Sequence, residues 1–119
     1  MPDPMVDLVS ARLRALADPM RIRLLDRLRH TPATVGELAD GVASSPQNVS
    51  RHLALMHREG MLSREKEGNF VRYALEDPSV AAICDMLCGA VTERVASLGQ
   101  AVGATPATTS TTNDPGESA

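Results

Sequence analysis

Apolar residues recur every three or four positions along most of the first 60 residues, interrupted by short polar breaks that contain proline or glycine. This spacing predicts amphipathic helices, because 3.6 residues per turn bring such positions onto one face. Four helices are predicted in this part of the chain, over residues 5–16, 19–29, 34–41 and 46–59. Gly41 is expected to end the third helix or to lie in the turn that follows it.

Start signals precede three of these helices. Asp18 and Ser45 are each followed by a proline, which favours the first position of a helix, so each is expected to cap its helix. Thr34 is followed three residues later by Glu37, which is the spacing of a capping box. Gly60 is expected to adopt the left-handed conformation that ends the fourth helix.

The second helix has two different sides. We expect its apolar side chains to be buried, namely Ile22, Leu24, Leu25 and Leu28. We expect its arginines to remain in solvent, namely Arg21, Arg23, Arg27 and Arg29. This division is typical of a surface helix that packs one stripe against a core.

After residue 60 the pattern changes. Residues 61–66 and 70–75 favour two short strands around a turn at residues 67–69, and alternate side chains of the second strand can pack on the helices. A final helix is predicted to begin at Asp77-Pro78-Ser79. It carries one long apolar stripe, which consists of Val80, Ile83, Cys84, Leu87, Cys88, Val91, Val95 and Leu98.

Composition bounds the fold class. The 119 residues are enough for one domain, and a core with one Tyr, one Phe and no Trp favours helices packed on helices. From Gly99 onward few residues could bury apolar surface, so residues 1–98 are predicted to form the domain and residues 99–119 a disordered tail. The predicted fold is mainly α with a small β-hairpin, and so small a domain can complete its core by dimerising.

The formal net charge of −3 is unevenly distributed. Residues 10–72 contain 11 of the 12 basic residues and 7 of the 15 acidic ones, a net of +4 that is compatible with a DNA-facing surface. No apolar run approaches the roughly 20 residues that span a bilayer. The N-terminus lacks a signal-peptide profile and cysteines are few, so we expect a cytoplasmic protein with no membrane contact.

The third and fourth helices, joined by a tight turn, predict a helix-turn-helix. At 100 degrees per residue, Val49, Leu53 and Met56 fall within about 40 degrees of one another and form an apolar side. The opposite side carries Gln47, Arg51, Ala54 and Arg58, flanked by Asn48 and Ser50. Because Gln and Asn suit adenine and Arg suits guanine, this helix is predicted to enter the major groove of DNA. The alternative is a polar side that is merely solvated.

The hairpin brings three cations close to its turn, namely Arg64, Lys66 and Arg72. There they can contact the DNA backbone or the minor groove. Two other classes of function compete with DNA binding. A protein-binding module would bind duplexes weakly or without dependence on salt. An enzyme that uses Cys84 and Cys88 would need an acid, a base or an orienting histidine, and none accompanies them, so we expect no enzyme.

Four stretches of the chain read ALADPMRIRLLDRL, VGELADGV, SSPQNVSRHLALMHREGML and EKEGNFVRYAL. Together they resemble the ArsR/SmtB family of bacterial transcriptional regulators, over about residues 8–95. The resemblance implies a winged helix-turn-helix homodimer, joined through its first and last helices, that usually represses by occupying an inverted-repeat operator on double-stranded DNA. By this resemblance the operator-reading helix contributes Ser45, Gln47, Asn48, Ser50, Arg51 and His52. The wing contributes Arg64, Lys66 and Arg72.

Many members of that family release DNA when they bind a metal ion, so their ligand positions can be compared with this chain. The cysteine pair of the third-helix site is absent, since the segment is Glu37-Leu38-Ala39-Asp40-Gly41. At the last-helix site the resemblance aligns Asp77, Ser79, Ala90 and Glu93. Both carboxylates match and both imidazoles are missing. Two carboxylates per half-site suit a hard, weakly held cation better than zinc or nickel. The alternative is that Asp77 caps a helix and Glu93 is solvated.

Cys84 and Cys88 share one helix face, where two thiolates could bind a soft metal ion or sense an oxidant. Their Cβ atoms would lie about 5–6 Å apart, farther than the roughly 3.5–4.5 Å of a disulfide. The alternative is that both pack as small apolar side chains. The sequence requires no cofactor. A divalent metal effector, regulation without an effector, a second regulatory protein and activation in place of repression are the open alternatives.

Overall fold

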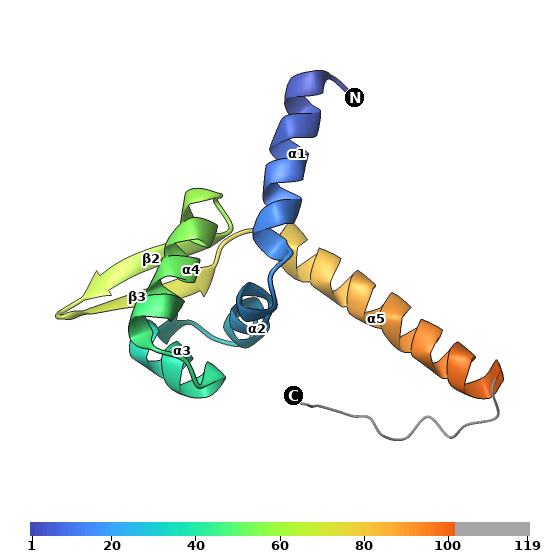
Figure 1. Cartoon of the computed structure of the whole chain (residues 1–119). Coiled ribbons are helices and arrows are strands. Elements are labelled where there is room, and N and C mark those ends of the chain that lie inside the picture. Colours follow the sequence, from blue (N-terminus) through green and yellow to red (C-terminus); the bar gives the residue numbers. More distant parts are fainter. Residues whose placement is uncertain (102–119) are drawn as a thin grey trace. The chain divides into compact units, whose positions relative to one another are not determined.

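The computed structural model describes residues 1–101, which form five helices and three strands (Figure 1). The elements are α1 Asp3–Leu16, α2 Pro19–Leu28, β1 Ala33–Thr34, α3 Val35–Val42, α4 Pro46–Arg58, β2 Leu62–Glu67, β3 Phe70–Leu75 and α5 Pro78–Ala101. Residues 1–81 form one compact unit, and a second unit begins at Ala82 within α5. The predicted helices and hairpin are confirmed, with small differences at their ends.

Side-chain caps start three helices where the sequence predicts them. The Asp18 carboxylate accepts hydrogen bonds from two backbone amides at the start of α2, at 2.8 and 3.1 Å. The Ser45 hydroxyl accepts from an amide in the first turn of α4 at 3.1 Å. Thr34 and Glu37 make both hydrogen bonds of the capping box at α3. These caps satisfy amide groups that have no partner inside the helix, and they fix where each helix begins.

The hairpin belongs to a three-stranded antiparallel sheet of order β1-β3-β2. The extra strand is β1, in which Ala33 lies opposite Tyr73 and Thr34 opposite Arg72. Two residues are too few to show an alternating pattern, and Thr34 is extended because it also caps α3. The predicted hairpin is therefore confirmed but incomplete.

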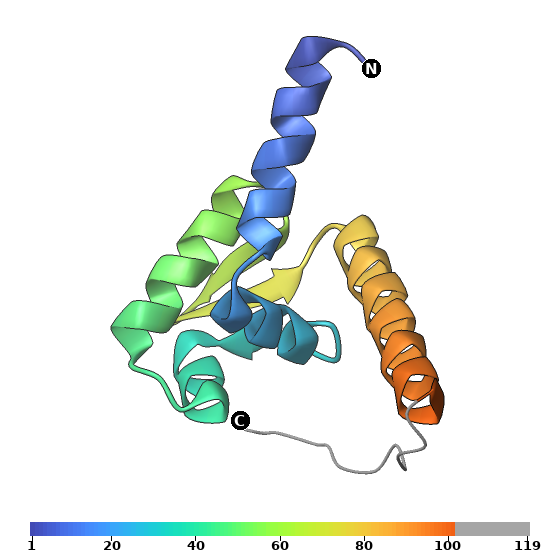
Figure 2. The ribbon, with the colours of Figure 1, turned by 45° about the vertical axis from the view of Figure 1, so that its right-hand side comes forward.

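The core of residues 1–81 forms where α2, α3, α4 and the sheet contact one another. Its largest fully buried side chains are Leu24, Leu38, Val49, Leu53, Met56, Met61 and Val80. Both ribbon views show α4 next to α3 and crossing in front of the hairpin (Figures 1 and 2). The core thus supports α4 from one side between Val49 and Met56.

Two residues of α2 differ from the prediction. Ile22 is 49% exposed, although its spacing places it with the buried leucines. The Arg21 side chain, expected in solvent, is only 14% exposed. Arg21 faces inward because its guanidinium donates hydrogen bonds to the backbone carbonyls of Ala15 and Arg14, at 2.6 and 3.2 Å. These carbonyls belong to the last turn of α1, where the usual amide donor four residues farther along the helix is lacking.

Left-handed residues end three elements. Gly60 has a φ of 77° and follows α4, as predicted, and Gly68 has a φ of 61° in the turn between β2 and β3. Gly41 does not end α3, because the helix continues to Val42 and Ala43 takes the left-handed position with a φ of 54°. The Ala43 amide donates to carbonyls in the last turn of α3, and these hydrogen bonds hold a conformation that is uncommon for alanine.

We expect the cap of α2 to make stability sensitive to acid. The backbone hydrogen bond from Arg21 is the main cause that lowers the pKa of Asp18, and the Arg21 charge adds to it. A lowered pKa means that the carboxylate stabilises the fold above the unfolded value of about 3.9, and that this contribution is lost as the pH falls through the folded value. Asp18→Asn keeps a good cap but cannot titrate. Its melting temperature should change less between about pH 5 and about pH 3 than that of the wild type, and equal changes would contradict this role.

Apolar side chains are exposed along α1 and α5. On α1 they are Met5, Val6, Leu8, Val9 and Leu13. On α5 they are Met86, Leu87, Val91, Val95 and Leu98. The predicted stripe of α5 is helical, and Val80 at its start is buried. Among the helices of residues 1–101, none combines the length and apolar character needed to cross a membrane.

The predicted domain boundary at residue 98 falls inside α5, which continues through Ala101. Gln100 and Ala101 are good helix formers and extend the helix past Gly99. The rest of the predicted tail, residues 102–119, lies outside the described residues.

Candidate nucleic-acid interface

Helix α4 packs against the core through one side only. Val49, Leu53 and Met56 have no exposed surface, and their spacing of four and three residues forms one continuous stripe. This confirms the predicted apolar side. Because α3 contacts α4 across the short turn between them, the helix-turn-helix is confirmed as well (Figure 2).

The other side of α4 is open to solvent. The exposed side chains are those of Ser45, Gln47, Ser50, Arg51 and Arg58, and Ala54 is half-buried. Most of them lie in the N-terminal half of the helix, which is the half that contacts base edges in helix-turn-helix proteins. The surface therefore presents amide, hydroxyl and guanidinium groups outward, and α4 has no large apolar side chain among its exposed residues.

Asn48 connects two neighbours on this surface. Its amide nitrogen donates to the Ser44 hydroxyl at 3.0 Å, and its amide oxygen accepts from the Arg51 guanidinium at 2.5 Å. Both ends of the amide are engaged, so Asn48 orients Arg51 before any ligand binds. The sequence prediction missed Ser44. Its position four residues before Asn48 is the signal that could have found it.

His52 faces the protein. Its Nδ1 atom lies 3.2 Å from the guanidinium of Arg21, which also lies 3.9 Å from the Asp18 carboxylate. The ring thus joins α4 to Arg21 at the start of α2, and Arg21 in turn binds the end of α1. A contact of His52 with DNA stays a prediction, while its contact with Arg21 is shown.

The hairpin has two different faces, because side chains of β2 alternate between basic and acidic. Arg64 and Lys66 are exposed on one face. Glu65 and Glu67 lie on the other face, the one that carries Arg72 of β3. The face with Arg64 and Lys66 suits DNA phosphates, because its cations lie apart from the carboxylates of β2.

Arg72 is held by two carboxylates. Its Nε atom lies 3.0 Å from Glu67, and its Nη1 atom lies 3.5 Å from Glu37. The hydrogen bond and the charge of Glu67, followed by the charge of Glu37, raise the pKa of Arg72 above its ordinary value. The structure therefore separates Arg72 from Arg64 and Lys66, although the sequence predicts that all three contact DNA.

Comparison with known proteins finds relatives that are transcriptional regulators. A family described as a helix-turn-helix domain matches residues 16–65. The regulator NmtR of Mycobacterium tuberculosis is 32% identical over 77 residues, which cover 65% of this chain and 64% of NmtR, a little under two thirds. The activator HlyU of Vibrio cholerae is 33% identical over 75 residues, which cover 63% of this chain and 69% of HlyU.

The regulator Rv0081 of M. tuberculosis is 30% identical over 101 residues, which cover 81% of this chain and 89% of Rv0081. Its crystal structure matches with a TM-score of 0.72 and 26% identity, over 81% of this chain and 97% of that one. The chain belongs to the ArsR/SmtB family of helix-turn-helix transcriptional regulators. The resemblance inferred from the sequence is thus confirmed, and the fold is a winged helix-turn-helix in which β2 and β3 form the wing.

In this member of the ArsR/SmtB family Asp77 caps α5. Its carboxylate accepts hydrogen bonds from the amide and the hydroxyl of Ser79, at 2.9 and 2.7 Å, and it is also paired with the guanidinium of Arg12. The hydrogen bonds from Ser79 are the main cause that lowers the pKa of Asp77, and the Arg12 charge adds to them. Arg12 donates as well to the backbone carbonyl of Glu59, at 2.7 Å, and so joins α1 to the end of α4.

The remaining metal candidates lie on the part of α5 beyond Ala81. Cys84 is half-buried, and Cys88 and Glu93 are exposed. Within residues 1–101, no three side chains of His, Cys, Asp or Glu gather into a group that could hold a metal ion. The carboxylate of Asp77 is engaged by Arg12 and Ser79. A metal effector stays a prediction.

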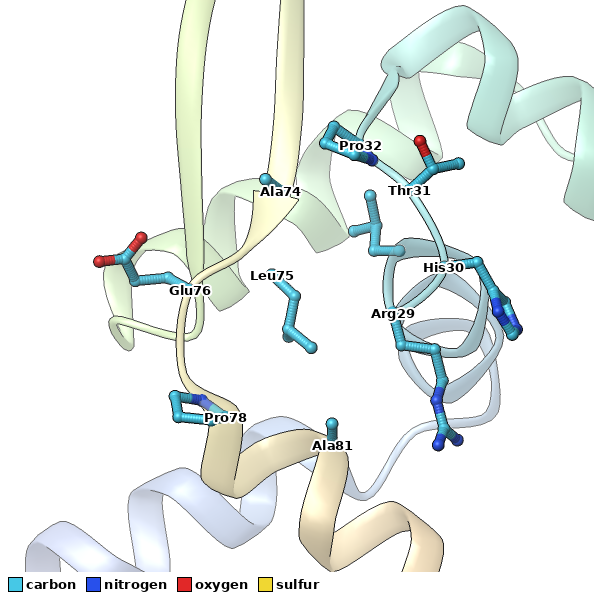
Figure 3. Close-up of a pocket in the computed structure, with 10 residues that line it drawn as sticks. Arg29, His30, Thr31, Pro32, Ala74, Leu75, Glu76, Pro78 and Ala81 are labelled. Atoms are coloured by element: carbon cyan, nitrogen blue, oxygen red, sulfur yellow. The ribbon is translucent and has the colours of Figure 1, made fainter.

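An open pocket lies at the C-terminal end of β3, next to the start of α5 (Figure 3). Leu75 points into it, whereas Arg29, His30 and Glu76 point away from it (Figure 3). None of the residues predicted to bind DNA lines this pocket. Arg29 is therefore a cation outside the candidate interface.

Proposed function

We propose that this ArsR/SmtB-family chain acts as a homodimer that binds an inverted repeat on double-stranded DNA. The observation that carries the proposal is the division of α4, with Leu53 among the fully buried side chains and Gln47 and Arg51 directed outward. In a twofold dimer the two α4 helices would enter major grooves about one helical turn apart. Arg51 suits guanine and Gln47 suits adenine, and both lie in the half of the helix that contacts bases.

The other predicted contacts take supporting roles. Ser45 and Ser50 are exposed beside Gln47 and suit phosphates or base edges. Asn48 acts through Arg51, which it orients. In the wing, Arg64 and Lys66 supply positive charge to the DNA backbone next to the groove that α4 enters.

Dimerisation is proposed through α1 and α5. Both helices expose large apolar side chains in the single chain, among them Leu8 and Leu13 on α1 and Leu87 and Val91 on α5. Exposed apolar stripes of this size mark surfaces that another protein covers. A second copy supplies the same two stripes, and a twofold axis lets each copy cover the other.

We favour repression, because a dimer seated on an operator excludes other proteins from that DNA. The same geometry also serves an activator, and the position of the operator decides between the two. The proposed function needs no cofactor and no reacting side chain, so we propose that the chain is not an enzyme. Since its ligand is chromosomal DNA, the proposal places it in the cytoplasm.

We expect duplex binding to weaken steeply with salt, because each cation that contacts a phosphate releases counterions. Lys66→Gln removes one cation from each protomer and should reduce the slope of log K against log salt by about 0.9 for each, which is about 1.8 for the dimer. It should also weaken binding to all sequences alike. Fluorescence anisotropy of a labelled duplex at several KCl concentrations measures both effects.

The matched control is Arg29→Gln, which removes one cation beside the pocket of Figure 3 and should leave the slope unchanged. An unchanged slope in Lys66→Gln would remove the wing from the interface. Wild-type binding that is undetectable at low salt, or that does not depend on salt, would overturn the proposed function and favour a protein-binding module.

A further inference from the structure

The strand β1 brings the start of α3 next to the wing. Thr34 lies opposite Arg72 in the sheet and is also the N-cap of α3. Glu37, in the first turn of α3, therefore reaches the Arg72 guanidinium at 3.5 Å. The same guanidinium lies 3.0 Å from Glu67, the last residue of β2 before the turn. One side chain thus connects the helix-turn-helix with the tip of the hairpin.

The surroundings of Arg72 are acidic. Glu37 and Glu67 pair with it, and Glu65 lies directly opposite it in β2. The carboxylates of Glu37 and Glu67 would repel a phosphate that approached the Arg72 guanidinium, because like charges repel. Lys66 lies on the other face of the hairpin, away from this cluster. Arg72 is thus placed to bind carboxylates of its own chain.

Glu37, the residue of α3 that pairs with Arg72, is itself held in place. A carboxylate oxygen of Glu37 accepts a hydrogen bond from the Thr34 amide at 2.9 Å, which closes the capping box. This hydrogen bond is the main cause that lowers the pKa of Glu37, and the charge of Arg72 contributes to a smaller extent. Glu37 is therefore charged at neutral pH and is held in one orientation by the helix that it caps.

We propose that Arg72 is a positioning residue, which holds the wing in a fixed place relative to α3 through Glu37 and Glu67 and does not contact DNA itself. The inference rests on the proposed function and replaces the direct contact that the sequence predicts for Arg72. A wing fixed in advance lets Lys66 and Arg51 reach the same duplex without an ordering cost at binding.

Glu37→Gln distinguishes a DNA contact of Arg72 from a positioning role, because the two roles predict opposite changes in duplex affinity. Glutamine can keep the capping-box hydrogen bond but loses the charge that holds Arg72. If Arg72 contacted a phosphate, removal of a nearby acid would strengthen duplex binding. If Arg72 positions the wing, Glu37→Gln weakens binding by about two- to fivefold, the scale of a lost exposed ion pair.

A double variant tests whether Glu37 and Arg72 act as one unit. Arg72→Gln should weaken binding by a similar factor, and Glu37→Gln combined with Arg72→Gln should bind no more weakly than Arg72→Gln alone. Lys66→Gln is the matched control, and its effect should add to that of Glu37→Gln because it lies on the other face. Stronger binding by Glu37→Gln, or fully additive effects of Glu37→Gln and Arg72→Gln, would overturn the inference.

Hydrogen exchange of the full chain without DNA supplies a readout that is independent of binding. Arg72→Gln should speed amide exchange at residues 34–37 and 67–70, whereas Lys66→Gln should not. If the wild type binds no duplex, the proposed function fails, but exchange still decides whether Arg72 joins α3 to the hairpin. Unchanged exchange in Arg72→Gln would contradict the positioning role in either case.

Discussion

Leu53→Ala should lower the free energy of unfolding by about 2–5 kcal/mol, the range for truncating a fully buried leucine. Leu53 has no exposed surface and lies at the centre of the stripe that docks α4. Its removal leaves a cavity between α4 and the core and also forfeits the transfer energy of the lost methyl groups. Urea denaturation followed by circular dichroism measures the loss.

Leu55→Ala is the matched control, because it makes the same substitution two residues away on the same helix. Leu55 is half-buried, so less apolar surface returns to water when it is truncated. We expect a clearly smaller loss of stability than for Leu53→Ala. Equal losses would mean that α4 is not docked by the side that carries Leu53, and the outward direction of Arg51 would then lose its support.

Arg51→Ala should weaken operator binding by about 1–3 kcal/mol for each half-site and relax the preference for one base pair in each. Arg51 is exposed, and Asn48 orients its guanidinium through a hydrogen bond of 2.5 Å. A guanidinium fixed in advance can pair with the two acceptors of guanine without losing side-chain freedom on binding. Competition titrations with operators changed at single base pairs measure both effects.

Arg58→Ala is the control for charge alone. Arg58 is exposed on the same side of α4, at the C-terminal end that lies farther from the bases in helix-turn-helix complexes. Its loss should weaken binding to all sequences alike and leave the preferred bases unchanged. If Arg51→Ala kept both the affinity and the preferences of the wild type, the assignment of α4 as the reading helix would be wrong.

The parts of the fold that depend on neighbours in sequence could be predicted. Helical spacing placed Val49, Leu53 and Met56 on one buried side, and the signals at Asp18 and Ser45 fixed where two helices begin. These features are determined within one or two helical turns, so a single sequence contains them. The two sides of α4 follow from the same local pattern.

The features that were missed depend on residues far apart in sequence. The pairing of Thr34 with Arg72 spans the whole helix-turn-helix, and no periodicity in two residues of β1 reveals it. Arg21 is held inward by the backbone carbonyls at the end of α1, and Ile22 is exposed. In the candidate site, the contact of His52 with Arg21 likewise requires that α2 and α4 be packed together.

The central claim is that α4 reads base sequence, and selection from a pool of random duplexes by the wild-type chain tests it most directly. We predict enrichment of an inverted repeat whose half-sites are about 10–10.5 base pairs apart, centre to centre, or a multiple of that spacing. Selection with Arg51→Ala in parallel should lose the preference at one position of each half-site. A wild-type selection that enriched no sequence over the starting pool would contradict the claim.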